Sequence, residues 1–161
     1  MNIFEKLTNQ MKETLDSAAS LALHSQNQEI TPAHVYWAFL ANHQSILNQA
    51  LNKMNIAKEA IELQARSEVD KLPKSSSVTK ENLSLSKECS AALHLAQGEA
   101  TKNGDSYIAA DMFLIANIKD GAFVSIFKPF VDINELKKTL LSLRGEVKID
   151  SQSGDDNLES L

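Results

Sequence analysis

Apolar residues recur every three or four positions through most of the chain, the spacing that places them on one face of an α-helix. The first such face consists of Met11, Leu15, Ala18 and Ala22. Thr8 stands just before it, where a hydroxyl favours a helix start by accepting from a backbone N–H. After a polar turn, Thr31 and Pro32 open a second helix that is almost wholly apolar as far as Leu40. The region 7–40 therefore predicts two packed helices.

The pattern of residues 7–40 returns 78 residues later, in residues 85–118. The identical pairs at this offset are Leu7/Leu85, Leu15/Leu93, Ala18/Ala96, Ala22/Ala100, Ile30/Ile108 and Ala38/Ala116. Each copy is followed by two further stretches with helical periodicity, and no segment alternates with period two over the length of a strand. We therefore predict an all-α fold of two pseudo-symmetric four-helix repeats, packed as one globular domain over residues 1–149.

The predicted repeats span about residues 4–73 and 83–149, joined by the polar, serine-rich segment 73–82. Residues 150–161, DSQSGDDNLESL, are acidic and contain no aromatic residue. Such a composition is typical of a flexible linker, because it offers little apolar surface to bury.

The composition limits the function classes. Of the net charge of −5, four negative charges belong to Asp150, Asp155, Asp156 and Glu159, so the predicted folded part carries about −1. A nearly neutral body does not match the basic footprint of a nucleic-acid binder. The single cysteine excludes an internal disulfide, the N-terminus does not read as a signal peptide, and no apolar run approaches the ~20 residues of a membrane span. We expect a soluble, cytoplasmic domain that binds neither nucleic acid nor membrane.

Catalytic and cofactor motifs are missing from the sequence. It has no glycine-rich phosphate loop, no HExxH and no CxxC. Cys89 and His94 could form a nucleophile and base, but Cys89 lies on an apolar helix face and matches Met11 of the first repeat. Asp105 and Asp111 could be paired catalytic acids. They could equally stabilise helix ends, because a carboxylate is favoured near a helix N-terminus. We therefore expect no enzyme activity, no metal and no cofactor in this chain.

Three segments resemble a known family: LTNQ near the start, NQEITPAHVYWAFL in the first repeat and NGDSYIAADMFLIANI in the second. They are similar to the N-terminal domain of Clp ATPases, over about residues 3–147. The run from Glu29 to His34, a polar residue followed by Ile-x-Pro-x-His, is more typical of the ClpB-type disaggregase branch. The resemblance implies a domain that engages unfolded or aggregated polypeptide through an apolar groove and presents it to a ring of ATPase modules.

The same resemblance implies a homohexameric parent protein that uses ATP and Mg, with the acidic tail leading to its ATPase modules and the isolated domain a monomer. An alternative from the same group of proteins is a regulatory domain that docks a folded adaptor protein.

The family's functional surface positions fall on Thr8, Asp105 and Asp111, and its apolar groove positions fall on Leu93 and Met112. Each has a second interpretation from the residues alone. Thr8 is also a helix cap, Asp105 also follows a turn glycine, and Leu93 matches a predicted core residue of the first repeat. Met112 matches the polar His34, which favours an exposed position. At Ala109 the family's usual capping serine is missing, so we expect a weakly held helix start there.

Overall fold

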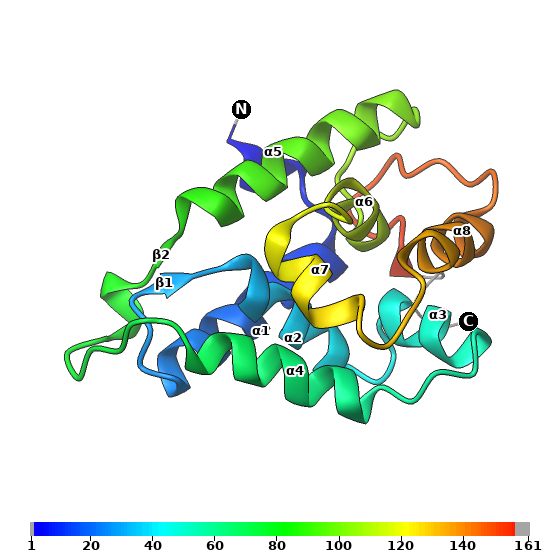
Figure 1. Ribbon diagram of the computed structural model, residues 1–161. Coiled ribbons are helices and arrows are strands. Elements are labelled where there is room, and N and C mark those ends of the chain that lie inside the picture. The colour runs from blue at the N-terminus through cyan, green and yellow to red at the C-terminus, as the bar shows by residue number, and fades with distance from the viewer. Residues whose placement is uncertain (1, 157–161) are drawn as a thin grey trace.

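Helices make up most of the computed structural model, which describes residues 2–156 (Figure 1). The α-helices are α1 (Asn9–His24), α2 (Pro32–Ala41), α3 (Ile46–Lys53), α4 (Glu59–Asp70), α5 (Lys87–Lys102), α6 (Ala110–Ala116), α7 (Gly121–Phe127) and α8 (Ile133–Arg144). Two 3-10 helices, η1 (Ile3–Lys6) and η2 (Lys80–Asn82), and two short strands, β1 (Glu29–Ile30) and β2 (Ser84–Leu85), complete the elements. The all-α prediction is confirmed, with a two-residue strand pair that the periodicity did not predict.

Hydroxyl groups cap the first helix of each half, as predicted for Thr8. The Thr8 hydroxyl accepts from the Met11 N–H at 3.2 Å, and the Ser86 hydroxyl accepts from the Cys89 N–H at 3.0 Å. The α1 face that points inward consists of Met11, Leu15, Ala18 and Ala22, as predicted. Helix α5 begins 78 residues after α1 and has the same length of 16 residues. The order of helices thus agrees with a duplication, while the repeat boundaries stay a prediction.

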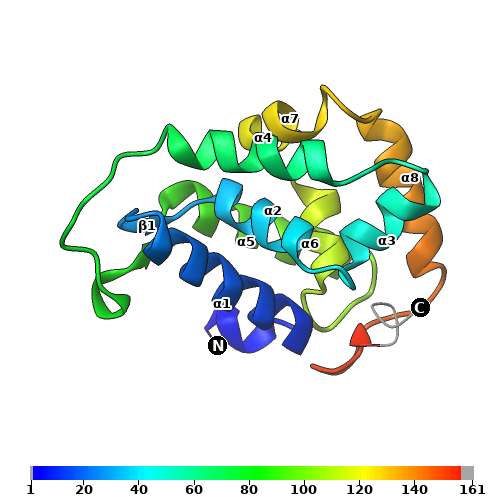
Figure 2. The same ribbon diagram turned by 90° about the horizontal axis from the view of Figure 1, so that it is seen from below.

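The two halves of the chain interlock. Within each half the first helix packs on the second, α1 on α2 and α5 on α6. Across the halves, α3 packs on α8 and α4 packs on α7, so each half supplies partners for the other (Figures 1 and 2). The result is one shared core instead of two adjacent ones.

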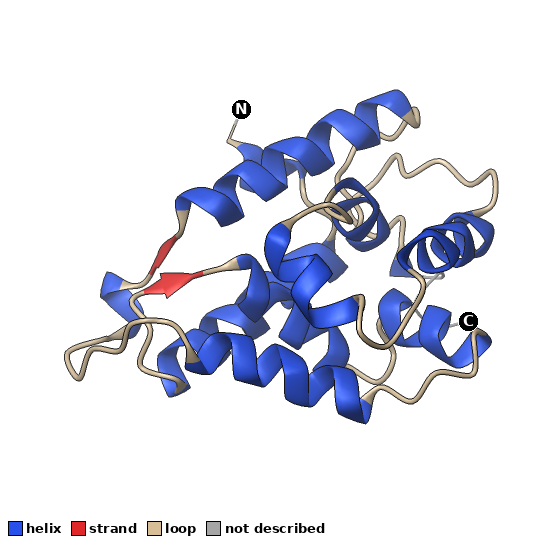
Figure 3. Cartoon of the chain, in the orientation of Figure 1, coloured by secondary structure: helices blue, strands red, loops and turns tan. Residues whose placement is uncertain are grey.

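Short parallel pairings tie the halves together at their turns, and Figure 3 shows one of them, the pair β1 and β2. In β1 and β2, Ile30 pairs with Leu85, and the Ser86 N–H donates to the Ile30 carbonyl at 3.0 Å. Leu7 pairs with Ile108 in the same parallel sense, and the Thr8 N–H donates to the Ile108 carbonyl at 3.1 Å. Each first helix is therefore anchored to the turn of the other half.

Aromatic rings from both halves fill the centre. Tyr36 of α2 meets Phe123 edge to face, with ring centroids 5.2 Å apart, and its hydroxyl donates to Asp120 at 3.1 Å. Phe113 and Phe127 also pack against Tyr36. Such pairs favour tilted or edge-to-face geometry because the ring edge and face carry opposite partial charges.

The C-terminal segment differs from the prediction of a flexible linker from Asp150 onward. Residues 150–156 return to the domain, where Asp155 is only 4% exposed and the Asn9 N–H donates to the Gln152 carbonyl at 2.7 Å. Composition misses this because a few hydrogen bonds at two helix starts, and not apolar burial, hold the segment. Residues 157–161 of the predicted linker lie outside the described residues.

Candidate functional site

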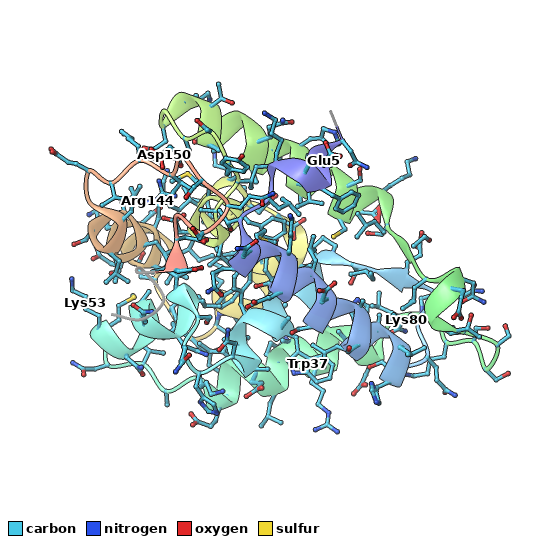
Figure 4. All side chains as sticks on the ribbon, turned by 180° about the vertical axis from the view of Figure 1, so that it is seen from behind. Glu5, Trp37, Lys53, Lys80, Arg144 and Asp150 are labelled. Carbon is cyan, nitrogen blue, oxygen red and sulfur yellow. The ribbon has the colours of Figure 1, made fainter. Side chains whose placement is uncertain are left out.

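Three of the five predicted site residues meet in one buried polar cluster. The Arg144 guanidinium, 2% exposed at the end of α8, donates to Asp105 from Nη1 at 2.8 Å. It also donates to Asp111 from Nη2 at 2.7 Å and from Nε at 2.9 Å. Burial raises the pKa of Asp111, and the guanidinium opposes that rise. Arg144 and Asp150 are labelled in Figure 4, on the side where the C-terminal segment returns.

Thr8 joins the same cluster through the C-terminal segment. Its hydroxyl donates to Asp155 Oδ2 at 2.9 Å, and the Ala110 N–H donates to the same oxygen at 3.1 Å. Asp155 thus caps α6 in place of the side-chain cap that Ala109 lacks. The expectation of a weakly held α6 start is corrected: its cap comes from 45 residues further along the chain.

These placements change the roles that the resemblance implied. Thr8, at 0%, Asp105, at 8%, and Asp111, at 1%, are buried by their own chain, so in this conformation they are not surface contacts for a client. Each carries a structural bond instead, to a helix start or to Arg144.

Leu93 and Met112 also lie in the core, at 1% and 2% exposure. Leu93 follows its periodicity and not the groove assignment. Met112 was expected to be exposed because its counterpart is His34, but His34 is itself 0% exposed. Helix α6 is covered on nearly every side, so its polarity pattern could not separate inside from outside. In this conformation neither side chain lines an accessible groove.

The candidate nucleophile fails on its geometry. Cys89 is 0% exposed, and burial raises the pKa of its thiol to about 12. His94 lies on the surface, where its Nδ1 faces the Ser90 carbonyl at 2.8 Å. Within residues 2–156 no cluster of three His, Cys, Asp or Glu side chains could hold a metal ion.

An apolar groove of about 360 Å³ opens beside α1. Its lining residues come from η1, α1, β1 and the end of the 73–85 connection; they are Phe4, Leu7, Lys12, Leu15, Asp16, Ala19, Ile30, Leu83, Ser84 and Leu85. Leu7, Leu15 and Ile30 are nearly covered, whereas Phe4 is 40% exposed. Lys12 and Asp16 supply one charge of each sign. The groove can therefore accept apolar side chains without strong charge selection.

The residues of this groove were missed as a site. Phe4 lies before the first periodic helix, and Leu83 follows the polar connection, so neither belongs to a helical face. Only the identity of Leu7 with Leu85 pointed to this region. The groove exists because the chain start and the connection, about 80 residues apart, lie beside the same helix.

A separate hydrogen-bond network closes the first half. The His34 Nδ1 accepts from the Thr31 N–H at 2.9 Å, which leaves Nε2–H to donate to Asn27 at 2.9 Å. Asn27 in turn donates to the Pro73 carbonyl at 3.0 Å. Burial lowers the pKa of His34 to about 4, so the imidazole is neutral at pH 7.

The architecture defines an all-helical domain with interlocked halves and an apolar surface groove. None of its described helices, within residues 2–156, is both long and apolar enough to cross a bilayer. Residues 6–130 match the family described as the Clp repeat (R) N-terminal domain, and the chain belongs to this family. That match is to an N-terminal domain and not to a catalytic ATPase module.

Individual relatives agree with this assignment. The chain is 81% identical over its full length to the chaperone protein ClpB of Helicobacter hepaticus, of which it spans 19%. Its structure is similar to the Hsp104 N-terminal domain from Candida albicans, with a TM-score of 0.83, 23% identity and coverage of 93% of this chain and 99% of that one. A ClpV N-domain in complex with a VipB peptide gives a TM-score of 0.66 at 20% identity, covering 86% of this chain and 87% of that one. The ClpB-type resemblance is confirmed at the level of the domain.

Proposed function

We propose that this chain is the client-binding domain of a ClpB-type chaperone and that it engages apolar stretches of unfolded or aggregated polypeptide. The observation that carries the proposal is the apolar groove beside α1. It combines a covered apolar floor with partly exposed side chains such as Phe4. A largely neutral lining accepts many sequences, which suits a binder of unfolded chains.

Binding at this groove is expected to be weak and reversible. A volume of about 360 Å³ holds only a few side chains at once. Contacts of this size correspond to micromolar to millimolar dissociation constants, about 4–8 kcal/mol. Weak binding allows the client to be released to the next step.

The test places a charge in the groove without disturbing the core. Ala19 is half-buried on α1 and lines the groove, so Ala19→Arg fills the groove with a charged side chain. Binding of a fluorescently labelled casein, an unfolded model client, is measured by titration. We expect about a tenfold loss of affinity, because a residue that blocks an apolar anchor costs at least ~1.4 kcal/mol.

The matched control is Ala60→Arg, at an exposed alanine of α4 outside the groove. It should bind casein as the wild type does, and both variants should keep the wild-type helicity. Equal affinities for Ala19→Arg and the wild type would rule out this groove as the client site. Phe4→Ala provides a second, milder variant and should weaken binding less.

The role in the parent protein is proposed on the same basis. We propose that this domain belongs to a cytoplasmic, homohexameric chaperone whose other modules bind ATP and Mg. The ClpB relatives are about five times as long as this chain, which leaves room for such modules. The isolated domain is expected to be a monomer. Sedimentation of the 161-residue chain should give a single species near 17.7 kDa.

Docking of an adaptor protein is the second candidate function. It is favoured by the ClpV N-domain, whose structure was solved with a VipB peptide. An adaptor would bind as one defined sequence, whereas client binding tolerates many. Competition between labelled casein and a panel of unrelated apolar peptides separates the two: broad competition supports a client site, and competition by a single peptide supports an adaptor site.

A further inference from the structure

The C-terminal segment is held against the domain by hydrogen bonds spread along its length. The Ser106 N–H donates to the Ile149 carbonyl at 2.7 Å, and the Ile149 N–H donates to Asp105 at 3.0 Å. Further along, Gln152 and Asp155 bind the starts of α1 and α6. The segment therefore crosses from the Arg144 cluster to two helix starts.

The bonds at the helix starts use donors that a helix leaves unpaired. Asn9 and Ala110 are the first residues of α1 and α6, and their N–H groups have no acceptor within the helix. The Gln152 carbonyl accepts from Asn9 at 2.7 Å, and the Asp155 carboxylate accepts from Ala110 at 3.1 Å. Both amides therefore report directly on the segment.

A close backbone approach fixes the path. A Cβ added at Gly154 would lie 2.8 Å from Ile149 Cγ2 and 3.0 Å from the Ser151 carbonyl oxygen. Real Cβ atoms essentially never come as near as the first of these distances. The sequence thus carries its smallest residue at the point where the segment folds back on Ile149.

Burial of the Asp155 carboxylate opposes docking of the segment. Asp155 is 4% exposed, yet its Oδ1 finds no hydrogen-bond partner among residues 2–156. The Arg144 guanidinium binds Asp105 and Asp111, whereas burial and the nearby Asp111 carboxylate raise the pKa of Asp155. A half-satisfied buried carboxylate carries a desolvation cost, which offsets part of the free energy that the hydrogen bonds contribute to docking.

We propose that residues 150–156 form a reversible strap, which docks on the starts of α1 and α6 and releases as a unit. Docking shortens the connection between this domain and whatever follows it, and release adds seven extended residues, about 23 Å of reach. Release also uncovers the helix starts. The proposal concerns the segment of this chain alone and does not depend on the client-binding proposal.

Amide hydrogen exchange of the 161-residue chain, read residue by residue by NMR, tests the strap. Asp155→Ala removes the carboxylate that binds Thr8 and Ala110. We expect the Asn9 and Ala110 amides to exchange about tenfold faster in this variant, because the acceptors that they have among residues 2–156 belong to the strap. The Thr8 and Ile108 amides, bonded between the halves, should keep their protection.

Asp156→Ala is the matched control. Asp156 is exposed, and its carboxylate accepts from the Gln10 amide at 3.1 Å, so its loss should leave the Asn9 and Ala110 amides protected. Gly154→Ala is the second variant: it leaves the cluster intact and should open the strap by steric conflict alone. Fast exchange at Asn9 and Ala110 in the wild type, or equal protection in wild type and both strap variants, would overturn the proposal.

Discussion

The two halves of the domain close the same turn with different chemistry. In the first half, the turn after α1 is fixed by neutral groups, with Asn27 bonded to His34 and His34 bonded to Thr31. At the positions 78 residues later, Asp105 replaces Asn27, and its partner is Arg144. The same backbone arrangement is thus stabilised once by an amide and an imidazole and once by a buried ion pair.

The two halves differ in which part of the chain supplies the partners of these polar groups. In the first network Asn27 and His34 are 7 residues apart, and the Asn27 amide also reaches Pro73, 46 residues away but within the same half. The second reaches 39 residues to Arg144, and its α6 cap comes from the C-terminal segment. The second half therefore depends on the C-terminal part of the chain, whereas the first depends on its own turn and on Pro73.

The largest expected effect comes from removing the charge that holds the second half. Arg144→Met leaves two buried carboxylates without their partner, and we expect unfolding free energy to fall by about 3–5 kcal/mol. Urea denaturation at pH 7 measures this loss. The loss should shrink at pH 5, because the unpaired carboxyls can then bind protons.

Lys138→Met is the control on the same helix. Lys138 pairs with Glu135 at 3.4 Å, but both side chains are exposed, at 74% and 58%. Exposed pairs of this kind contribute little, so stability should change by less than about 0.5 kcal/mol. Similar losses of stability in Arg144→Met and Lys138→Met would contradict the view that burial makes the Arg144 cluster important for stability.

The neutral network of the first half predicts sensitivity to acid. The unfolded chain binds a proton on His34 near pH 6.5, whereas the folded imidazole binds one only near pH 4. The folding stability that depends on neutral His34 is therefore complete above pH 6.5 and is lost as the pH falls toward 4. The total amounts to as much as about 3 kcal/mol.

His34→Met, which copies the residue of the second half, should flatten this dependence. Urea midpoints at pH 7, 5.5 and 4.5 measure it, with His43→Gln as a control at an exposed histidine. If the urea midpoint of His34→Met falls with pH as steeply as that of the wild type, the neutral His34 network is not the source of the acid sensitivity.

The smallest effect concerns the two helix ends. Gln26 adopts φ of 60°, the left-handed conformation that Gly104 adopts at the matching position with φ of 82°. Gln26→Gly should raise stability by about 0.5 kcal/mol, because only glycine enters this region without a steric cost. Gln28→Gly lacks that gain, since Gln28 has no positive φ. Thermal unfolding of both variants measures their stabilities. An equal loss of stability in the two variants would show that the left-handed conformation of Gln26 carries no steric cost.

The sequence predicted the helical faces well where burial follows periodicity. Met11, Leu15, Ala18 and Ala22 are the buried residues of α1, and Thr8 caps α1 as predicted. Beyond the end of α8, Val147 continues the apolar spacing of the helix but is 50% exposed. Arg144 at the end of α8 is buried instead, because two aspartates far along the chain satisfy its charge.

The five predicted site residues fall into two groups in the structure. Thr8, Asp105 and Asp111 do meet, although as a buried cluster that binds the chain's own C-terminal segment. Leu93 and Met112 belong to the core, and the groove is lined by residues such as Phe4 and Leu83 that no helical pattern selects. Periodicity reports which face of a helix is apolar, but not which apolar face its neighbours leave open.

By itself the sequence determined the all-helical class, the repeated order of elements and the main caps, because these depend on contacts within a few residues. Only the tertiary structure decided three other features: the exchange of partners between the halves, the charge cluster at Arg144 and the return of residues 150–156. Each of these joins groups that are tens of residues apart. Their free energy depends on burial and on a partner's position, neither of which is written in local spacing.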